Sequence, residues 1–145
     1  MIRARITGTG SYVPEKVLTN LDIEKFLDTN DEWIRTRTGI CERHIAADDE
    51  QTSDLATKAA ERAIEMAGIS PEDLDLIVVG TITGDYPWPA TACIVQANLG
   101  ARNAGAFDVS AACSGFLYAV SCAVDRVEAG RAKKALVIGA EVLSR

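Results

Sequence analysis

One cysteine of this sequence stands where a nucleophile could act. Cys113 lies in the stretch Ala106–Gly115, Ala-Phe-Asp-Val-Ser-Ala-Ala-Cys-Ser-Gly, in which an apolar run predicts a buried strand and the later spacing predicts a helix from Ser114. The unpaired N–H groups of a helix's first turn carry partial positive charge and favour a thiolate over a thiol. Small neighbouring residues leave room for a substrate carbonyl to approach the sulfur. These features predict a cysteine that becomes acylated.

A second group of candidates lies earlier in the chain. Asn30 is a suitable N-cap for a short helix that carries Trp33 and Arg37, with Gly39 as its end. From the residues alone, Trp33 and Arg37 fit a binding site. Equally, Trp33 fits a half-buried anchor and Arg37 a solvated charge. The functional and the structural interpretation both stay open at this point.

A tryptophan is also displayed in the segment Gly84–Ala90. Pro87 and Pro89 flank Trp88 and interrupt regular pairing, so we expect a loop whose backbone is fixed beside the indole. A rigidly displayed indole is typical of a contact surface. Pro89 also fits the first position of a helix that we expect over residues 90–99.

The remaining thiols and the histidine do not have the spacing of a metal site. Cys41 and His44 are close enough in sequence to share a metal, but no second pair completes the ligand set, so we expect no metal. Cys93 lies among apolar residues of one predicted helix and Cys122 lies deep inside another, which favours packing roles. We interpret the cysteines as free thiols.

Composition restricts the possible classes of protein. The chain has 145 residues, 48% of them hydrophobic, which is enough for the core of one domain. Its formal net charge is -6, which argues against a general nucleic-acid-binding surface. Its N-terminus lacks an apolar signal region, and no window approaches the ~20 apolar residues of a membrane span. We therefore expect a cytoplasmic protein that binds neither nucleic acid nor membrane.

Strands and helices alternate along the predicted chain. The expected strands are Ile2–Ile6, with alternating burial, and the apolar runs Leu76–Gly80, Ala106–Val109 and Ala135–Gly139. The expected helices are a short one with Asn20 as N-cap, the Trp33 helix, and residues 52–68, 90–99 and 114–130. This order predicts an α/β layered fold, with helices on both faces of a mixed, mostly parallel sheet and right-handed crossovers.

The helix predicted over residues 52–68 has a narrow apolar face. Four-residue spacing connects Leu55, Ala59, Ala63 and Ala67. We expect Thr52 or Ser53 to cap this helix, Gly68 to end it, and its alanine-rich face to pack closely on the sheet. The earlier Gly8-x-Gly10 lacks the third glycine of a dinucleotide fingerprint, and Val13-Pro14 follows where a helix should open, so that site is not expected.

Several stretches together resemble the N-terminal half of β-ketoacyl-[acyl carrier protein] synthase III, a thiolase-fold condensing enzyme that starts fatty-acid synthesis. They are Gly8-Thr-Gly-Ser-Tyr-Val-Pro, Asn30-Asp-Glu-Trp-Ile-Arg-Thr-Arg-Thr-Gly-Ile, Glu42-Arg-His-Ile-Ala, Leu76-Ile-Val-Val-Gly-Thr and Phe107-Asp-Val-Ser-Ala-Ala-Cys-Ser-Gly-Phe. The resemblance covers nearly all of residues 1–145, which we therefore interpret as an incomplete N-terminal thiolase-like domain. It implies an acyltransferase with a layered α/β thiolase fold.

The resemblance implies a reaction in two steps. Cys113 would attack the thioester of a short acyl-CoA and release CoA. The acyl-enzyme would then be attacked by the carbanion that forms when malonyl-[acyl carrier protein] loses carbon dioxide. A thiolate suits both steps because it is a strong nucleophile and a tolerable leaving group. The backbone N–H of Cys113 would be one oxyanion donor. No cofactor is expected, since the CoA thioester is a substrate.

The resemblance also gives roles to the aromatic and cationic candidates. Trp33 and Arg37 match positions that stack on the adenine of CoA and hold the nucleotide, and Thr29 is a weaker match to the same site. An indole offers a π-face and a guanidinium offers charge and a planar fork, which suits that role. Trp88 matches a position, usually phenylalanine, that crosses a homodimer interface to line the partner's acyl pocket. The larger indole suggests a short acyl primer.

Members of the family are longer, and their catalytic histidine and asparagine lie in the second half. His44 does not match that histidine, and we interpret it as structural. We therefore expect this chain to be a fragment, inactive alone, whose C-terminal half comes from elsewhere and could be a separate chain. The N-terminal half of family members also has a further strand beyond Arg145, and we expect the sheet without that strand to have an open edge. The alternatives are a non-catalytic interaction module and a related thiolase-fold enzyme that condenses acyl-CoA.

Overall fold

The computed structural model describes residues 2–144 of the chain. These residues form two compact units, which we describe separately. The sheet unit combines the N-terminal segment up to Tyr12 with Gln51–Leu143, and the small unit contains Val13–Glu50 and the C-terminal end from Ser144. Among the described residues, none of the helices has the length and apolar content needed to cross a membrane.

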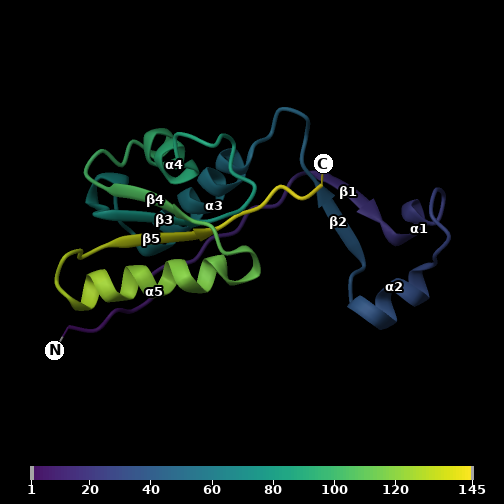
Figure 1. The fold of residues 1–145 in the computed structure, drawn as a ribbon, viewed down its shortest axis with the longest axis horizontal. Coiled ribbons are helices and arrows are strands. Elements are labelled where there is room, and N and C mark those ends of the chain that lie inside the picture. The colour runs from purple at the N-terminus through teal and green to yellow at the C-terminus, as the bar shows by residue number, and fades with distance from the viewer. Residues whose placement is uncertain (1, 145) are drawn as a thin grey trace. The chain divides into compact units, whose positions relative to one another are not determined.

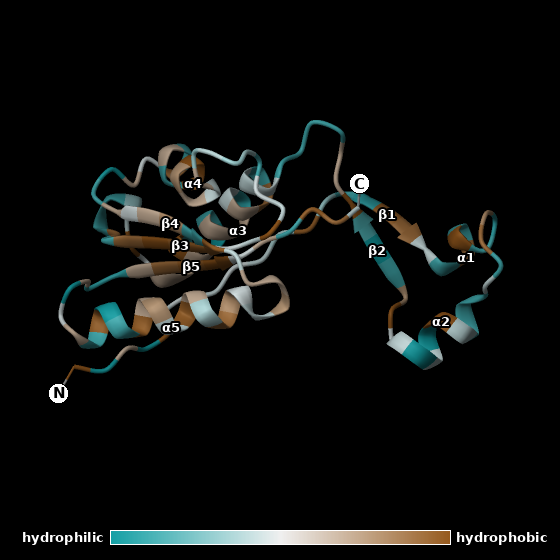
Figure 2. Ribbon diagram, in the orientation of Figure 1, coloured by the Kyte–Doolittle hydropathy of each residue, from teal (hydrophilic) through white to brown (hydrophobic). Residues whose placement is uncertain are grey.

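The sheet unit is built on three parallel strands, labelled in Figure 1. Strand β3 (Leu76–Gly80) lies in the middle, between β4 (Gly105–Val109) and β5 (Ala135–Gly139). Every residue of β3 is buried, as its continuous apolar sequence predicted. Figure 2 shows the same strand as a hydrophobic band between its neighbours.

Helices cover both faces of this sheet. Helices α3 (Thr52–Ala67) and α4 (Thr91–Leu99) lie on one face, and α5 (Gly115–Glu128) lies on the other (Figure 1). Each face has its own apolar cluster, with Ile77 and Val79 on the α3–α4 side and Val78 on the α5 side. The predicted α/β fold, with helices on both faces of a largely parallel sheet, is therefore confirmed.

The small unit pairs two antiparallel strands, β1 (Lys16–Thr19) and β2 (Glu42–Ile45). Helices α1 (Asn20–Ile23) and α2 (Asp31–Thr38) connect them. Helix α2 has the predicted ends: the Trp33 N–H donates to Asn30 Oδ1 at 2.8 Å, and Gly39 takes a left-handed conformation with φ of 74°.

The prediction that Asn20 caps α1 is wrong, because Thr19 does so by accepting the Asp22 N–H at 3.2 Å. The Asn20 side chain is buried instead, donating to Asp31 Oδ1 at 2.8 Å and to the Ile40 carbonyl at 2.9 Å. Its oxygen accepts a hydrogen bond from Arg43. Asn20 therefore joins α1, α2 and β2. Hydrogen bonds from Lys25 and then Thr19 hold the pKa of the Asp22 carboxyl well below its usual range.

The strand predicted over Ile2–Ile6 is not formed. The N-terminal segment instead approaches α3 so closely that a Cβ on Gly8 would lie 2.4 Å from the Ala63 carbonyl, and one on Gly10 2.3 Å from that of Ala59. Only glycine permits such contact between backbones.

The alanine-rich face of α3 therefore receives the N-terminal segment, whereas the prediction placed it on the sheet. The residues of α3 in the core cluster of the sheet are Ala56, Ala60 and Ile64, with Ala63 partly buried beside them. Two predicted helix starts also shift. Helix α3 begins after Gln51, and α4 begins at Thr91, beyond Pro89. Gly68 and Gly100 end these helices in left-handed conformations, as expected.

Candidate functional site

Cys113 lies in a tight turn between β4 and α5. The turn is a short 3-10 helix, η2 (Ala112–Ser114), so α5 begins one residue after the predicted start at Ser114. Ala112 has a φ of 45°, in the left-handed region that residues other than glycine rarely adopt. The Cys113 side chain is exposed and its thiol is free. The geometry thus presents a reachable thiol immediately before a helix of 14 residues.

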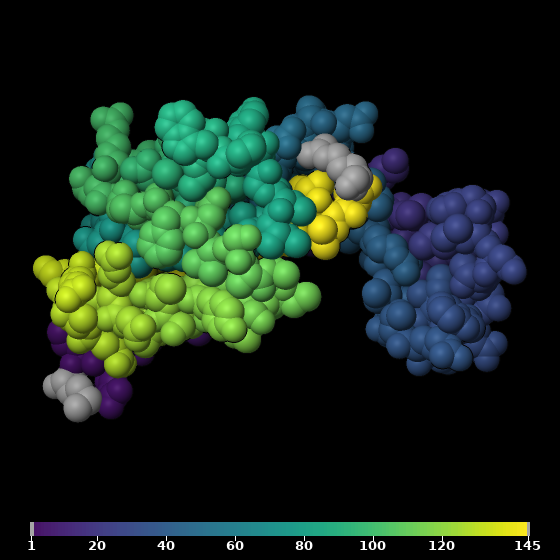
Figure 3. Space-filling view, viewed as in Figure 1, coloured from purple at the N-terminus to yellow at the C-terminus, as the bar shows by residue number. Residues whose placement is uncertain are grey.

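Close backbone packing fixes the start of α5 on the central strand. A Cβ on Gly80, the last residue of β3, would lie 2.6 Å from the Gly115 carbonyl carbon and 2.7 Å from the Phe116 nitrogen. The Cα of Gly80 lies 3.4 Å from a Cβ placed on Gly115. Only glycine at position 80 therefore lets the start of α5, and with it the cysteine turn, pack directly against β3. In Figure 3, α5 forms a continuous surface layer of the sheet unit.

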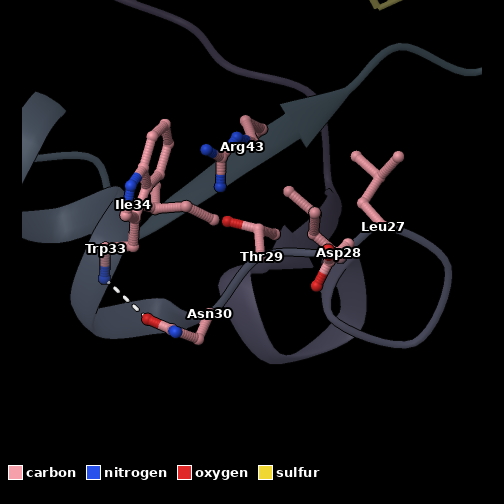
Figure 4. A pocket seen from close by; sticks show the side chains of 8 residues that line it. Leu27, Asp28, Thr29, Asn30, Trp33, Ile34 and Arg43 are labelled. Atoms are coloured by element: carbon pink, nitrogen blue, oxygen red, sulfur yellow. Dashed lines mark hydrogen bonds between the residues drawn. The ribbon is translucent and has the colours of Figure 1, made fainter.

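A pocket of about 580 Å³ lies in the small unit (Figure 4). It is lined by Ile23, Leu27, Asp28, Thr29, Asn30, Trp33, Ile34 and Arg43. The structure thereby brings together two predicted site residues, Thr29 and Trp33. The Trp33 side chain is 53% exposed, so it is only partly anchored.

The groups that line this pocket include the indole of Trp33, the guanidinium of Arg43 and the carboxylate of Asp28. Within residues 2–144, the buried hydroxyl of Thr29 has no hydrogen-bond partner, and an unsatisfied buried hydroxyl is costly. The Arg37 guanidinium lies 5.1 Å from the centroid of the Trp33 ring, which is a cation–π contact. Arg37 therefore stacks beside the pocket without lining it.

Arg43 lines the pocket but was not singled out from the sequence. It lies within the Glu42-Arg-His-Ile-Ala stretch on β2, where a single arginine carries no signal of its own. Arg43 donates a hydrogen bond to Asn20. Asn20 could have indicated a polar partner in this region, but it had been interpreted as a helix cap. Arg43 adds a second guanidinium near Trp33.

The other candidates lie as follows. Trp88 is in the sheet unit, on the predicted loop, with 86% of its surface exposed. His44 Nδ1 forms a hydrogen bond with the Pro14 carbonyl, which agrees with a structural role. Cys93 and Cys122 are half-buried, as packing residues would be. Among the described residues, no cluster of three or more histidine, cysteine or acidic side chains could bind a metal ion.

Comparisons with known proteins identify the relatives of this chain. The family model of 3-oxoacyl-[acyl-carrier-protein] synthase III matches residues 107–145, which include Cys113. A β-ketoacyl-[acyl-carrier-protein] synthase III of Caldanaerobacter subterraneus is 61% identical over 144 residues, covering 99% of this chain and 44% of that relative.

Solved structures give the same relationship. The 3-oxoacyl-[acyl-carrier-protein] synthase III of Aquifex aeolicus superposes with a TM-score of 0.92 and 51% identity, over 99% of this chain and 46% of that one. The priming β-ketosynthase of the R1128 polyketide pathway superposes with a TM-score of 0.86 and 43% identity, over 90% of this chain and 40% of that one. The thiolase-like half-domain predicted from the sequence is confirmed, and the chain spans less than half the length of these relatives.

Proposed function

We propose that this chain, which resembles the N-terminal half of β-ketoacyl-[acyl carrier protein] synthase III over nearly all its length, is the acyl-accepting half of such an enzyme. The observation that carries the proposal is the exposed thiol of Cys113 at the turn into α5, within the segment that the family model matches. The reaction would begin fatty-acid synthesis by condensing a short acyl group with a malonyl unit.

Cys113 performs the first step. Its thiolate attacks the carbonyl carbon of an acyl-CoA, the new carbon–sulfur bond forms, and the bond to the CoA sulfur breaks, so that CoA leaves as a thiolate that takes up a proton. The backbone N–H of Cys113 is one donor to the oxyanion of the tetrahedral intermediate. In the second step, malonyl-[acyl carrier protein] loses carbon dioxide, and its carbanion takes the acyl group from Cys113.

The pocket of the small unit binds the nucleotide of CoA. The adenine stacks on the exposed face of Trp33, and the hydroxyl of Thr29, which has no partner within residues 2–144, gains one from the ligand. Arg37 and Arg43 attract the phosphates, since a guanidinium offers charge and a planar pair of donors. Partly exposed Trp33 and the solvated Arg37 thus have a role beyond that of surface residues.

The remaining groups come from other chains or segments. The histidine and asparagine that assist decarboxylation belong, by resemblance, to a C-terminal half, and the coverage of less than half of the relatives supports this assignment. Trp88 contacts a second copy in a homodimer and lines that copy's acyl pocket, which agrees with its 86% exposure. Chain 1–145 alone therefore lacks full activity.

Labelled acetyl-CoA tests this proposal when chain 1–145 is combined with the C-terminal half. One labelled acetyl group per chain is expected, and none in the Cys113→Ala variant. Label that persists in this variant would remove Cys113 from the mechanism. Trp33→Ala should weaken CoA binding while leaving the Cys113 thiol reactive, because the two residues have separate roles.

One observation favours a second function for the isolated polypeptide. The catalytic histidine and asparagine of the family belong, by resemblance, to the C-terminal half, which favours a non-catalytic interaction module that pairs with another thiolase-fold chain. Absence of acylation in the combined halves, together with stable pairing, would support that function. The similarity to a priming ketosynthase keeps a related condensing reaction as a further alternative, which competition between acyl-CoA substrates would identify.

A further inference from the structure

The loop that displays Trp88 has ends that lie against each other. We call the segment from Gly84 to Ala90, with Tyr86 and Trp88 exposed, the aromatic loop. A Cβ placed on Gly84 would lie only 2.7 Å from the hydroxyl oxygen of Thr91, the first residue of α4. The loop therefore leaves and rejoins the sheet unit at nearly the same place, and its shape depends on what holds the two ends.

Glu141 holds the segment that enters the aromatic loop. This residue follows β5, and its carboxylate accepts the backbone N–H of Ile82 at 2.9 Å and that of Thr83 at 3.0 Å. The same carboxylate accepts the Thr81 hydroxyl at 3.2 Å and the Thr83 hydroxyl. Four donors from three consecutive residues thus converge on one side chain. Hydrogen bonds to a charged acceptor are stronger than neutral ones.

Asp85 adds a second connection on the same side. Its carboxylate, at the second position of the aromatic loop, accepts the Ser53 N–H in the first turn of α3 at 2.9 Å. A carboxylate is favourable at a helix N-terminus because the unpaired N–H groups there carry partial positive charge. The entering part of the loop is therefore tied both to the segment after β5 and to α3.

Asp108 holds the end of the loop. Helix α4 has Ala90 at its N-cap position, and alanine offers no side-chain acceptor. Asp108 of β4 supplies the missing acceptors, with Oδ2 accepting the Thr91 N–H at 2.7 Å and Oδ1 the Ala92 N–H at 2.8 Å. The strand that leads to Cys113 thereby also fixes the residue at which the aromatic loop ends.

The position of Trp88 then follows from these carboxylates. Between the anchored ends remain five residues, Tyr86–Ala90, two of which are prolines that restrict the backbone. The Trp88 side chain itself is 86% exposed, so little packing fixes its position. We propose that Asp108 and Glu141 are positioning residues that hold Trp88 where it limits the size of the acyl group transferred to Cys113 of the partner subunit. This inference rests on the proposed function, in which Trp88 lines the acyl pocket of a second copy in the homodimer.

Three variants test this proposal in chain 1–145 combined with the C-terminal half. Asp108→Asn and Glu141→Gln keep side-chain size but replace one carboxylate oxygen by an NH2 group. In Asp108→Asn, one N–H donor loses its acceptor, because Thr91 and Ala92 donate to different oxygens. In Glu141→Gln, either the Ile82 N–H loses its acceptor at 2.9 Å and keeps only the oxygen at 3.3 Å, or the Thr83 N–H loses its acceptor. Asp75→Asn is the control for loss of a carboxylate that anchors another segment. Asp75 Oδ2 accepts the Lys133 N–H at 2.7 Å and the Lys134 N–H at 3.0 Å, in the segment before β5.

The measured quantity is the ratio of kcat/KM for acylation by acetyl-CoA to that by butyryl-CoA. We expect both loop variants to shift this ratio about tenfold toward butyryl-CoA, which is the smallest discrimination that a methylene group carries in an apolar pocket. We expect Asp75→Asn to leave the ratio unchanged. A ratio that stays at the wild-type value in both loop variants overturns the proposal, and so does an equal shift in Asp75→Asn.

Hydrogen exchange separates this inference from the proposed function. Exchange at the amides of Thr91 and Ala92 should accelerate in Asp108→Asn, and exchange at Ile82 and Thr83 in Glu141→Gln. Unchanged exchange at these amides contradicts the anchoring and overturns the inference, whatever the acylation results. If the wild-type halves are not acylated at all, the proposed function fails, and with it the selectivity part of the inference.

Discussion

The contact between Gly80 and the start of α5 provides the sharpest structural prediction. In Gly80→Ala, the new Cβ would lie 2.6 Å from the Gly115 carbonyl carbon and 2.8 Å from its oxygen. Ordinary contact begins at 3.4 Å, so the helix start must retreat by roughly 0.8 Å. All three nearest atoms belong to the backbone, so no side-chain rotation relieves the overlap.

This retreat has two expected consequences. Overpacking of this kind costs about 1–3 kcal/mol of unfolding free energy, which urea denaturation of chain 1–145 can measure. The turn that carries Cys113 moves with α5, and a misplacement of about 1 Å can reduce a reaction rate about 10²-fold. We therefore expect acylation by acetyl-CoA, measured with the C-terminal half present, to fall by about that factor.

Gly105→Ala is the matched control. Gly105 begins β4, and the nearest neighbour of its added Cβ would be the Asp75 carbonyl oxygen at 4.0 Å. This variant should leave the unfolding free energy near the wild-type value and the acylation rate within about twofold of wild type, because no neighbouring atom needs to move. Wild-type stability and wild-type acylation in Gly80→Ala would refute the conclusion that this glycine positions the cysteine turn.

Three further predictions concern other parts of the chain. Thr29→Val should leave the unfolding free energy unchanged or higher, since the lost hydroxyl has no hydrogen-bond partner in the described chain. Calorimetry should find that this variant binds CoA about tenfold more weakly. Equal CoA affinity would remove Thr29 from the site. Asn20→Leu should cost about 2 kcal/mol in urea denaturation by leaving Arg43 without its acceptor; unchanged stability would contradict that role. The N–H groups of Lys133 and Lys134 lower the pKa of the Asp75 carboxyl, so its stabilisation exists above the unfolded value of about 3.9 and is lost as pH falls through the folded value. Asp75→Asn should therefore flatten the acid side of the stability curve, and an unchanged curve would contradict this.

The parts of the fold that follow from local sequence were predictable. The continuous apolar run of β3 and the glycines that end α2, α3 and α4 act through burial and backbone conformation within a few residues. The cysteine turn was also predictable in outline, because an apolar strand runs directly into a helical pattern. Its left-handed Ala112 was not, since alanine carries no signal for that conformation.

The failures share a physical cause, which is contact between residues distant in sequence. Alternation of Ile2, Ala4 and Ile6 predicted a strand, but the described structure gives this segment no strand pairing. Asn20 had the right chemistry for a helix cap, but its amide bonds Asp31 and Ile40 instead. Asp108 of β4 accepts the hydrogen bonds from the N-terminus of α4. The sequence indicated this only indirectly, because Ala90, at the N-cap position of α4, has no side-chain acceptor of its own.

The pocket that contains Thr29 and Trp33 likewise depends on both local sequence and a contact distant in sequence. Their presence in one pocket follows from the short separation in sequence, but the pocket itself also requires Arg43 from β2. The roles given to Cys113, Trp33, Arg37, Thr29 and Trp88 in binding and catalysis stay predictions.

Selective acylation is the decisive test of Cys113 as the nucleophile, because the chain contains a second exposed cysteine as a control. Cys41 and Cys113 are both exposed and free, but only Cys113 lies at the turn into α5. Chain 1–145, combined with the C-terminal half, should be incubated with acetyl-CoA, digested and mapped by mass spectrometry. We expect an acetyl thioester on Cys113 and none on Cys41. Equal acetylation of the two thiols, or an unmodified Cys113, would contradict it.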